Sequence, residues 1–173
     1  MASTYSETKA IFNSLDPVLN GTGAIKNPGE VDNFVKTMKD VNLLAGRCLL
    51  LNALKATKSA AILQKFTESD GWIMLNSWLI EYKKIQGGNP AILIELLEVL
   101  HKLPVTIITL KNGSMGKMVK QLAKHDHPEV KSRSTALLTK WMALFGKGKG
   151  MYSDLVWHYY VTSRHGNYIN SPM

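Results

Sequence analysis

The 173-residue chain contains one cysteine, Cys48, and no apolar run of membrane-spanning length. A single thiol forms no internal disulfide, and a membrane helix needs about 20 consecutive apolar residues. The first six residues are polar, whereas a secretion signal requires an apolar stretch there. We therefore expect a globular protein of a reducing compartment, the cytosol or the nucleus, without membrane association.

The sequence also lacks sustained alternation of apolar and polar residues, which is the pattern of a β-strand, and it shows no repeat of fixed period. Apolar residues instead recur at spacings of three and four between residues 6 and 145. These spacings predict an all-α fold of about eight short helices, forming a bundle or an array of helical hairpins. The helical segments cover residues 6–17, 31–41, 47–57, 59–67, 71–85, 90–102, 106–111, 114–124 and 128–145.

Side-chain patterns assign faces and caps to some of these helices. Helix 90–102 is apolar over much of its circumference, so we expect it to be central, with Asn89 as its N-cap and Pro90 at its first position. Arg47 precedes an apolar helical segment and is expected to pair with an acidic neighbour. The buried face of helix 47–57 is expected to contain Cys48, Leu49, Leu51, Asn52 and Leu54. Three tryptophans at helical spacing are expected in the core: Trp72, Trp78 and Trp141.

Positive charge is concentrated in one part of the chain. Residues 111–150 hold nine basic and two acidic side chains, whereas the charges of residues 1–110 nearly balance. Such a block attracts nucleic acid or acidic peptide, but it is also typical of a solvated helical face. The candidate basic face consists of Lys111, Lys117, Lys120, Lys124, Lys131, Arg133 and Lys140.

The sequence contains few residue groups suited to catalysis, metal binding or phosphate binding. Cys48 is flanked by leucines, as a buried structural cysteine is, and His125-Asp126-His127 has too few ligands for a tetrahedral metal site. The segment 112–117 lacks the glycine spacing and the preceding strand of a phosphate loop. Glu95 and Glu98 share a helical face and are expected to face solvent. We therefore expect no enzyme activity, no metal and no cofactor.

A family resemblance appears in an ordered set of motifs. The chain resembles the N-terminal domain shared by transcription elongation factor TFIIS, elongin A and a Mediator subunit, over about residues 70–145. The motifs are Gly71-Trp72, Leu75-Asn76-Ser77-Trp78-Leu79, Leu96-Leu97, Leu103-Pro104-Val105-Thr106, Leu110-Lys111, Met115-Gly116-Lys117-Met118-Val119, Leu122, Lys124-His125, Val130, Ala136, Leu138 and Trp141.

Within that superfamily, residues 6–145 look most like the N-terminal part of the nuclear targeting subunits of protein phosphatase 1 (PNUTS). The additional motifs are Gly46-Arg47-Cys48, Leu51-Asn52 and Lys117-Met118-Val119-Lys120-Gln121-Leu122. The resemblance implies a nuclear scaffold that works with RNA polymerase II and chromatin. Its phosphatase-docking motif, a basic residue followed by Val-x-Phe or Val-x-Trp, is absent from this chain. Phosphatase 1 is thus expected as a partner only through a segment that this chain lacks.

These observations divide the chain into three parts. Residues 1–69 are expected to be an N-terminal helical extension packed on the next part, and residues 70–145 a TFIIS N-terminal-like helical domain. Residues 146–173 begin with alternating glycine and lysine, which predicts a flexible linker followed by a disordered or loosely docked tail.

The favoured hypothesis for function is a nuclear protein-interaction module that binds short disordered motifs of transcription and chromatin proteins. If successive helices are antiparallel, two loops fall at one end of the bundle, and exposed loops on a rigid scaffold are where recognition concentrates. Relatives of this domain are understood to receive acidic and aromatic motifs there. The candidate peptide-binding residues are Gln86, Gly87, Asn89, His125, Asp126, His127, Pro128 and Glu129.

Three alternatives remain open. In the first, the two loops only connect helices and bind no partner. In the second, the chain is a plain structural adaptor of a larger assembly. The third alternative is a nucleic-acid-binding module that uses the basic face of residues 111–140. Clustered cations suffice for weak phosphate attraction, but sequence readout needs a groove-fitting helix, for which the sequence shows no signal.

Overall fold

The computed structural model describes residues 2–85 and 89–146, and in these ranges it contains nine α-helices, one 3-10 helix and no β-strand. The all-α prediction is confirmed. The predicted tail, residues 147–173, lies outside the described residues. The helices are α1 (Ala2–Leu15), η1 (Pro28–Glu30), α2 (Val31–Asp40), α3 (Leu44–Ala56), α4 (Ala60–Glu68), α5 (Asp70–Lys84), α6 (Pro90–Lys102), α7 (Ile107–Lys111), α8 (Met115–Leu122) and α9 (Pro128–Gly146).

Most helix boundaries follow from local capping chemistry. Helix α6 has the predicted bounds, because Pro90 occupies its first position and Asn89 Oδ1 accepts a hydrogen bond from the Ala91 backbone N–H at 3.1 Å. Helix α1 begins four residues before the predicted start at Ser6. The Thr8 hydroxyl donates to the Thr4 carbonyl at 2.8 Å, so Ser6 lies inside a continuous helix.

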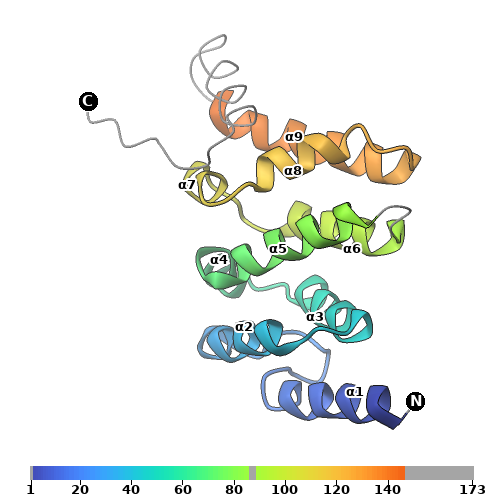
Figure 1. Ribbon diagram of the computed structural model, residues 1–173. Coiled ribbons are helices and arrows are strands. Elements are labelled where there is room, and N and C mark those ends of the chain that lie inside the picture. The colour runs from blue at the N-terminus through green and yellow to red at the C-terminus, as the bar shows by residue number, and fades with distance from the viewer. Residues whose placement is uncertain (1, 86–88, 147–173) are drawn as a thin grey trace.

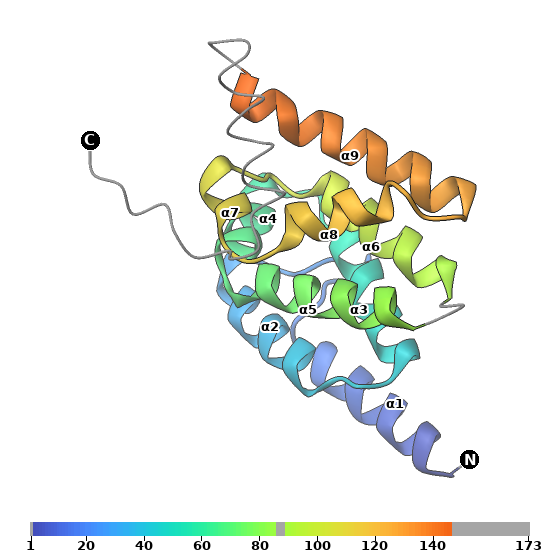
Figure 2. The ribbon, with the colours of Figure 1, turned by 45° about the horizontal axis from the view of Figure 1, so that its top comes forward.

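The helices stack in three units of three, α1–α3, α4–α6 and α7–α9 (Figures 1 and 2). Helices α2, α5 and α8 form one column, and α3, α6 and α9 form a second column packed on it. Successive helices begin 39 and 45 residues apart in the first column and 46 and 38 in the second, which is close to the spacing of armadillo-type arrays, whereas α1, α4 and α7 begin 58 and 47 residues apart. The structure is therefore a short helical array, although the sequence shows no repeat.

One hydrophobic cluster runs through the whole stack, from Leu15 in the first unit to Trp141 in the last. Trp72, Trp78 and Trp141 are all buried, as predicted. The rings of Trp72 and Trp141 meet edge to face with centroids 6.1 Å apart, which ties α5 to α9. The Trp72 indole N–H also donates to the Asn112 carbonyl at 3.1 Å.

The buried face of α3 differs from the prediction. Asn52 is exposed, and Cys48 and Leu49 are only half-buried. Helix α3 packs on α1 in its own unit and on α6 in the next. Its buried surface therefore differs from the single apolar stripe that the sequence predicts. The buried residues are Gly46, Arg47, Leu50, Leu51, Ala53 and Leu54.

Glu95 and Glu98 do not face open solvent as the sequence suggested. Both carboxylates of α6 pair with the Lys55 ammonium of α3, and Glu98 Oε1 also lies 3.0 Å from Arg133 Nη2 of α9. Burial disfavours the charged form of Lys55, but its bonds to the two carboxylates outweigh this and raise the pKa of the ammonium. These ion pairs link the three helices of the second column.

Candidate peptide-binding site

Four helix ends meet at one end of the stack, on the right in Figure 1. They are the C-terminus of α5, the N-terminus of α6, the C-terminus of α8 and the N-terminus of α9. Because α5 and α6, and likewise α8 and α9, run in opposite directions, the residues flanking the two candidate loops lie together. We call this surface the loop end.

The first candidate loop joins α5 to α6. Gln86 and Gly87 fall outside the described residues, whereas Asn89 is exposed at the edge of the loop end. The side-chain oxygen of Asn89 is engaged in capping α6. A substitution at Asn89 therefore changes both the surface and the start of α6.

The second candidate loop, between α8 and α9, is folded by its own polar groups. The His127 backbone N–H donates to His125 Nδ1 at 3.0 Å, which leaves Nε2 as the protonated nitrogen when that imidazole is neutral. The Nδ1 atom of His127 is buried and makes no hydrogen bond within the described part of the chain. Asp126 and Pro128 are exposed.

Glu129 lies in the first turn of α9 and accepts a hydrogen bond from Arg133 Nε at 2.9 Å. Arg133 also pairs with Glu98, so both members of this pair are engaged within the fold. Of the five residues predicted in this loop, Glu129 alone is engaged in an ion pair among the described residues, and Asp126 and Pro128 are the other two that are exposed.

The fold separates the seven residues of the predicted basic face. Lys117, Lys120 and Lys124 share one side of α8 and its C-terminal extension, and Lys131 is exposed on the first turns of α9. Lys140, farther along α9, donates to the carbonyl of His101, and Arg133 is paired as described above. Lys111 ends α7, at the opposite end of the stack (Figure 1).

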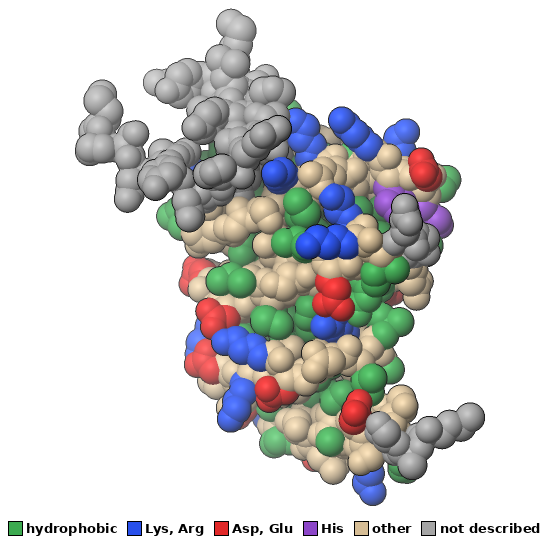
Figure 3. Space-filling view, viewed as in Figure 1, with side chains coloured by type: hydrophobic (Ala, Val, Ile, Leu, Met, Phe, Trp, Pro, Cys, Tyr) green, Lys and Arg blue, Asp and Glu red, His purple; other side chains and the backbone are tan. Residues whose placement is uncertain are grey.

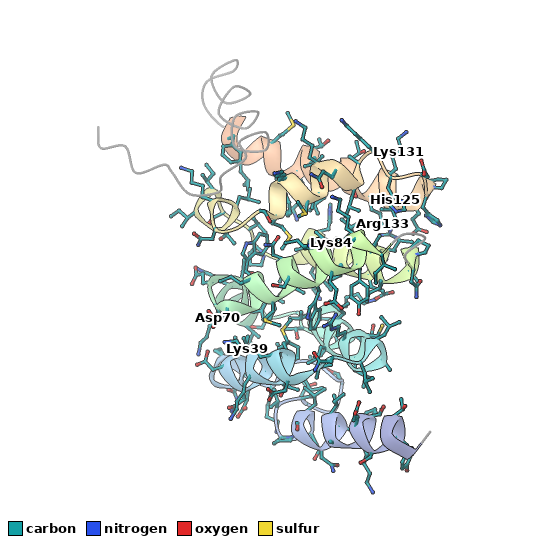
Figure 4. The ribbon with its side chains drawn as sticks, in the orientation of Figure 1. Lys39, Asp70, Lys84, His125, Lys131 and Arg133 are labelled. Carbon is teal, nitrogen blue, oxygen red and sulfur yellow. The ribbon has the colours of Figure 1, made fainter. Side chains whose placement is uncertain are left out.

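Two further cations belong to the loop end, although the sequence analysis did not single them out. Lys83 and Lys84 occupy the last turn of α5, where Lys83 binds the side-chain oxygen of Gln121 on α8. Lys84 is exposed and is labelled in Figure 4 with His125 and Lys131. Their position in the last turn of helix 71–85, beside a candidate loop, was the signal that could have identified them.

The charge around the loop end is therefore positive. Figure 3 shows lysine and arginine side chains over α8 and α9, with the histidines at the right-hand edge. At the opposite end of α6, burial and then the positive charges of Lys140 and Arg133 lower the pKa of His101. Neither residues 2–85 nor 89–146 bring three His, Cys, Asp or Glu side chains together as a metal site requires. No helix in these ranges has both the length and the apolar composition to cross a bilayer.

Known proteins match this chain in two ways. Residues 95–145 match a family model described as the TFIIS helical bundle-like domain of Med26. Serine/threonine-protein phosphatase 1 regulatory subunit 10 from Sus scrofa is 34% identical over 145 residues, which cover 83% of this chain and 16% of the relative. Its counterpart from Pan troglodytes is also 34% identical, with 83% and 15% covered, and that from Xenopus laevis is 32% identical, with 83% and 18% covered.

The chain thus spans less than a fifth of the length of these relatives. The family match runs from the middle of α6 to the end of the third helical unit, and the all-α fold agrees with it. Residues 95–145 are thus similar to the TFIIS helical bundle-like domain, and over most of its own length the chain is similar to regulatory subunits of protein phosphatase 1.

Proposed function

We propose that this chain is a non-enzymatic, nuclear protein-interaction module of a transcription-associated scaffold. The loop end receives short disordered motifs in which an apolar or aromatic side chain is flanked by acidic residues. The observation that carries this proposal is the meeting of two loops on capped helix ends, surrounded by exposed cations. Lys84, Lys124 and Lys131 form no ion pair among the described residues and complement an acidic flank.

The scaffold role is supported by the similarity to phosphatase 1 regulatory subunits, and we propose the nuclear location from the resemblance to the TFIIS domain. We propose transcription and chromatin proteins as the partners that carry the motif. Phosphatase 1 is proposed as a partner of the scaffold, but not through a basic-Val-x-Phe or basic-Val-x-Trp segment in residues 1–173, because none occurs there. Purified residues 1–173 should therefore not bind the isolated catalytic subunit tightly by this motif.

Nucleic-acid binding is the second candidate function, and one observation favours it. Lys117, Lys120 and Lys124 lie on one side of α8 and its C-terminal extension, where they form a row of cations. Such contacts attract DNA or RNA without reading a sequence. We place this function second because only cation clustering supports it.

Capture of partners from nuclear extract by the whole chain, followed by peptide mapping, would identify the motif. Its affinity and that of a DNA duplex would then be measured between 50 and 200 mM salt. A duplex held by six or so phosphate contacts loses roughly a thousandfold in affinity over this range. A peptide anchored by apolar side chains should lose far less.

Two sets of variants separate the candidates. Replacing Lys117, Lys120 and Lys124 by Glu should abolish duplex binding and only moderate peptide binding. Asn89→Lys with His127→Asp should do the reverse, and Lys36→Glu, an exposed change on α2, should alter neither. A chain whose only ligand is nucleic acid, bound equally well after the loop changes, would refute the peptide proposal.

A further inference from the structure

A groove of about 690 Å³ lies at the end of the stack opposite the loop end. The α4–α5 junction forms one wall and α7 forms the other. Its apolar lining is exposed to an unusual degree, because Ile73 is 54% exposed and Ile108 is 75% exposed. Trp72 lies beside them as a buried part of the lining.

The shortness of α7 explains the groove. Helix α7 has five residues, whereas its counterparts α1 and α4 have 14 and nine. Thr106 caps its start, and Gly113, with a φ of 93°, turns the chain away just after its end. The third unit therefore covers less of the α4–α5 junction than a full-length helix would, and the two isoleucines remain uncovered.

The chain leaves α9 close to this groove. Trp141 of α9 packs on Trp72, which lines the groove. Gly146 follows Trp141 by five residues, which is about 7.5 Å along a helix axis. Figures 1 and 2 both show the C-terminal end of α9 on the same side of the stack as α7.

The sequence after α9 has the reach and the composition to fill the groove. Residues 147–150 alternate lysine and glycine, and the next ten residues include Leu155, Val156 and Trp157 together with three tyrosines. Eleven residues separate Gly146 from Trp157, which span at most roughly 36 Å when extended. The aromatic segment therefore reaches the groove without strain on the chain.

Charge also favours this segment as the occupant. Asp70 at the groove edge is neutralised by Lys39, at 2.6 Å (Figure 4). Two further charged side chains line the groove without an ion pair among the described residues: Glu68, which accepts a hydrogen bond from Gln64 of its own helix, and Lys111 on the α7 wall, which is the cation that a carboxylate of the occupant meets. Residues 151–160 hold one carboxylate, Asp154, two positions before Val156.

We propose that residues 151–160 dock in the groove between the α4–α5 junction and α7, with Trp157 against Ile73 and Ile108 and with Asp154 toward Lys111. The segment acts in place of the missing length of α7. Its tether gives it an effective concentration of about millimolar, so weak apolar contacts suffice to hold it. Of the two expectations drawn from the sequence, a disordered or a loosely docked tail, this proposal takes the second, and it does not depend on what the loop end binds.

Trp157 itself reports docking. Its emission is obtained in the whole chain by subtracting the spectrum of a Trp157→Phe variant, and its acrylamide quenching is compared with that of a peptide of residues 147–173. Docking predicts blue-shifted emission and quenching several-fold weaker than in the peptide. Both should be independent of protein concentration, because the contact is intramolecular.

Groove variants then locate the contact. Ile108→Glu or Ile73→Glu should return Trp157 emission and quenching to the values of the peptide. Ile85→Glu is the matched control, since Ile85 is 51% exposed at the other end of α5, and it should change neither value. Circular dichroism would confirm that each variant retains its helices.

Three outcomes would overturn the proposal. The first is Trp157 emission equal to that of the peptide in the unaltered chain. The second is protection that both groove variants leave intact. The third is protection that disappears on dilution, which would assign the segment to a second copy of the chain.

Discussion

The Arg47 guanidinium of α3 lies 5.0 Å from the centroid of the Trp78 ring of α5. Arg47 also faces the Tyr82 ring, donates to the Tyr82 hydroxyl at 3.1 Å and pairs with Glu81 at 2.9 Å. The predicted acidic partner is thus confirmed. The side chain of Arg47 is 7% exposed and that of Glu81 is 52% exposed, so the stacking and hydrogen bonds are buried while the carboxylate stays in water.

This asymmetry predicts unequal costs for the two partners of the ion pair. Arg47→Ala should lower the free energy of unfolding by about 2 to 4 kcal/mol, because it leaves buried polar groups unpaired and removes packing. Glu81→Gln should cost less than about 1 kcal/mol, because the Glu81 carboxylate is half in water and the Arg47 guanidinium keeps the Val41 carbonyl, the Tyr82 hydroxyl and the Trp78 ring. Urea denaturation measures both, and equal losses would assign the stability to the ion pair instead of the rings. Arg47→Lys should restore little, because an ammonium lacks the planar stacking surface.

Trp141 is 1% exposed, so its truncation should create a cavity between α9 and α5. Trp141→Ala should lower the free energy of unfolding by about 3 to 5 kcal/mol. Met142→Ala, one residue along α9 and 39% exposed, is the control and should change stability by less than about 0.5 kcal/mol. A near-neutral Trp141→Ala would contradict the buried position of the ring.

Position 71 requires glycine because there is no room for a Cβ atom, and not because of its backbone conformation. A Cβ atom at this position would lie 2.4 Å from Cε2 of the fully buried Phe66 ring. Gly71→Ala should therefore destabilise the chain by about 1 to 3 kcal/mol in chemical denaturation, although alanine favours helices by roughly 1 kcal/mol. Gly21→Ala, where a Cβ would meet nothing within 4 Å, should not do so.

Cys48 should react slowly with alkylating agents at neutral pH. Burial, followed by the negative charge of Glu95, raises the pKa of the Cys48 thiol, and the positive charge of Lys55 offsets part of this rise. Little thiolate is therefore present at neutral pH. Glu95→Gln should speed alkylation, because it removes the negative charge and releases Lys55 from that pair. Mass spectrometry of iodoacetamide adducts over time would measure the rate. An unchanged or slower rate in the variant would show that burial alone controls the thiol.

Local chemistry made much of the fold predictable. The bounds of α6 follow from Asn89 and Pro90, and the burial of the three tryptophans follows from their helical spacing. The same chemistry does not specify contacts between helices. Glu95 and Glu98 were assigned to solvent because nothing in their own helix showed that Lys55, 40 residues earlier, would lie beside them.

The candidate site was predictable to a similar degree. Antiparallel neighbours place the two loops at one end, and the spacing of four residues is that of the Glu129–Arg133 pair, but helix periodicity does not show that Arg133 also reaches Glu98 of α6 or that Lys111 lies at the other end. The three-unit array was also missed. Its units share an arrangement of helices without sharing sequence motifs, and their first helices differ in length from 14 to five residues.

The stacked arrangement also determines which helices a ligand at the loop end stabilises. In such arrays each unit is stabilised by its neighbours alone, so stabilisation spreads stepwise and weakens with distance. The main contacts of α1 are with α2 and α3, two units away from the α8–α9 loop. A ligand at the loop end should therefore slow amide hydrogen exchange most in α5, α6, α8 and α9 and leave α1 exchanging at its unliganded rate. Ligand binding would then protect one half of the molecule and leave exchange in the other half unchanged.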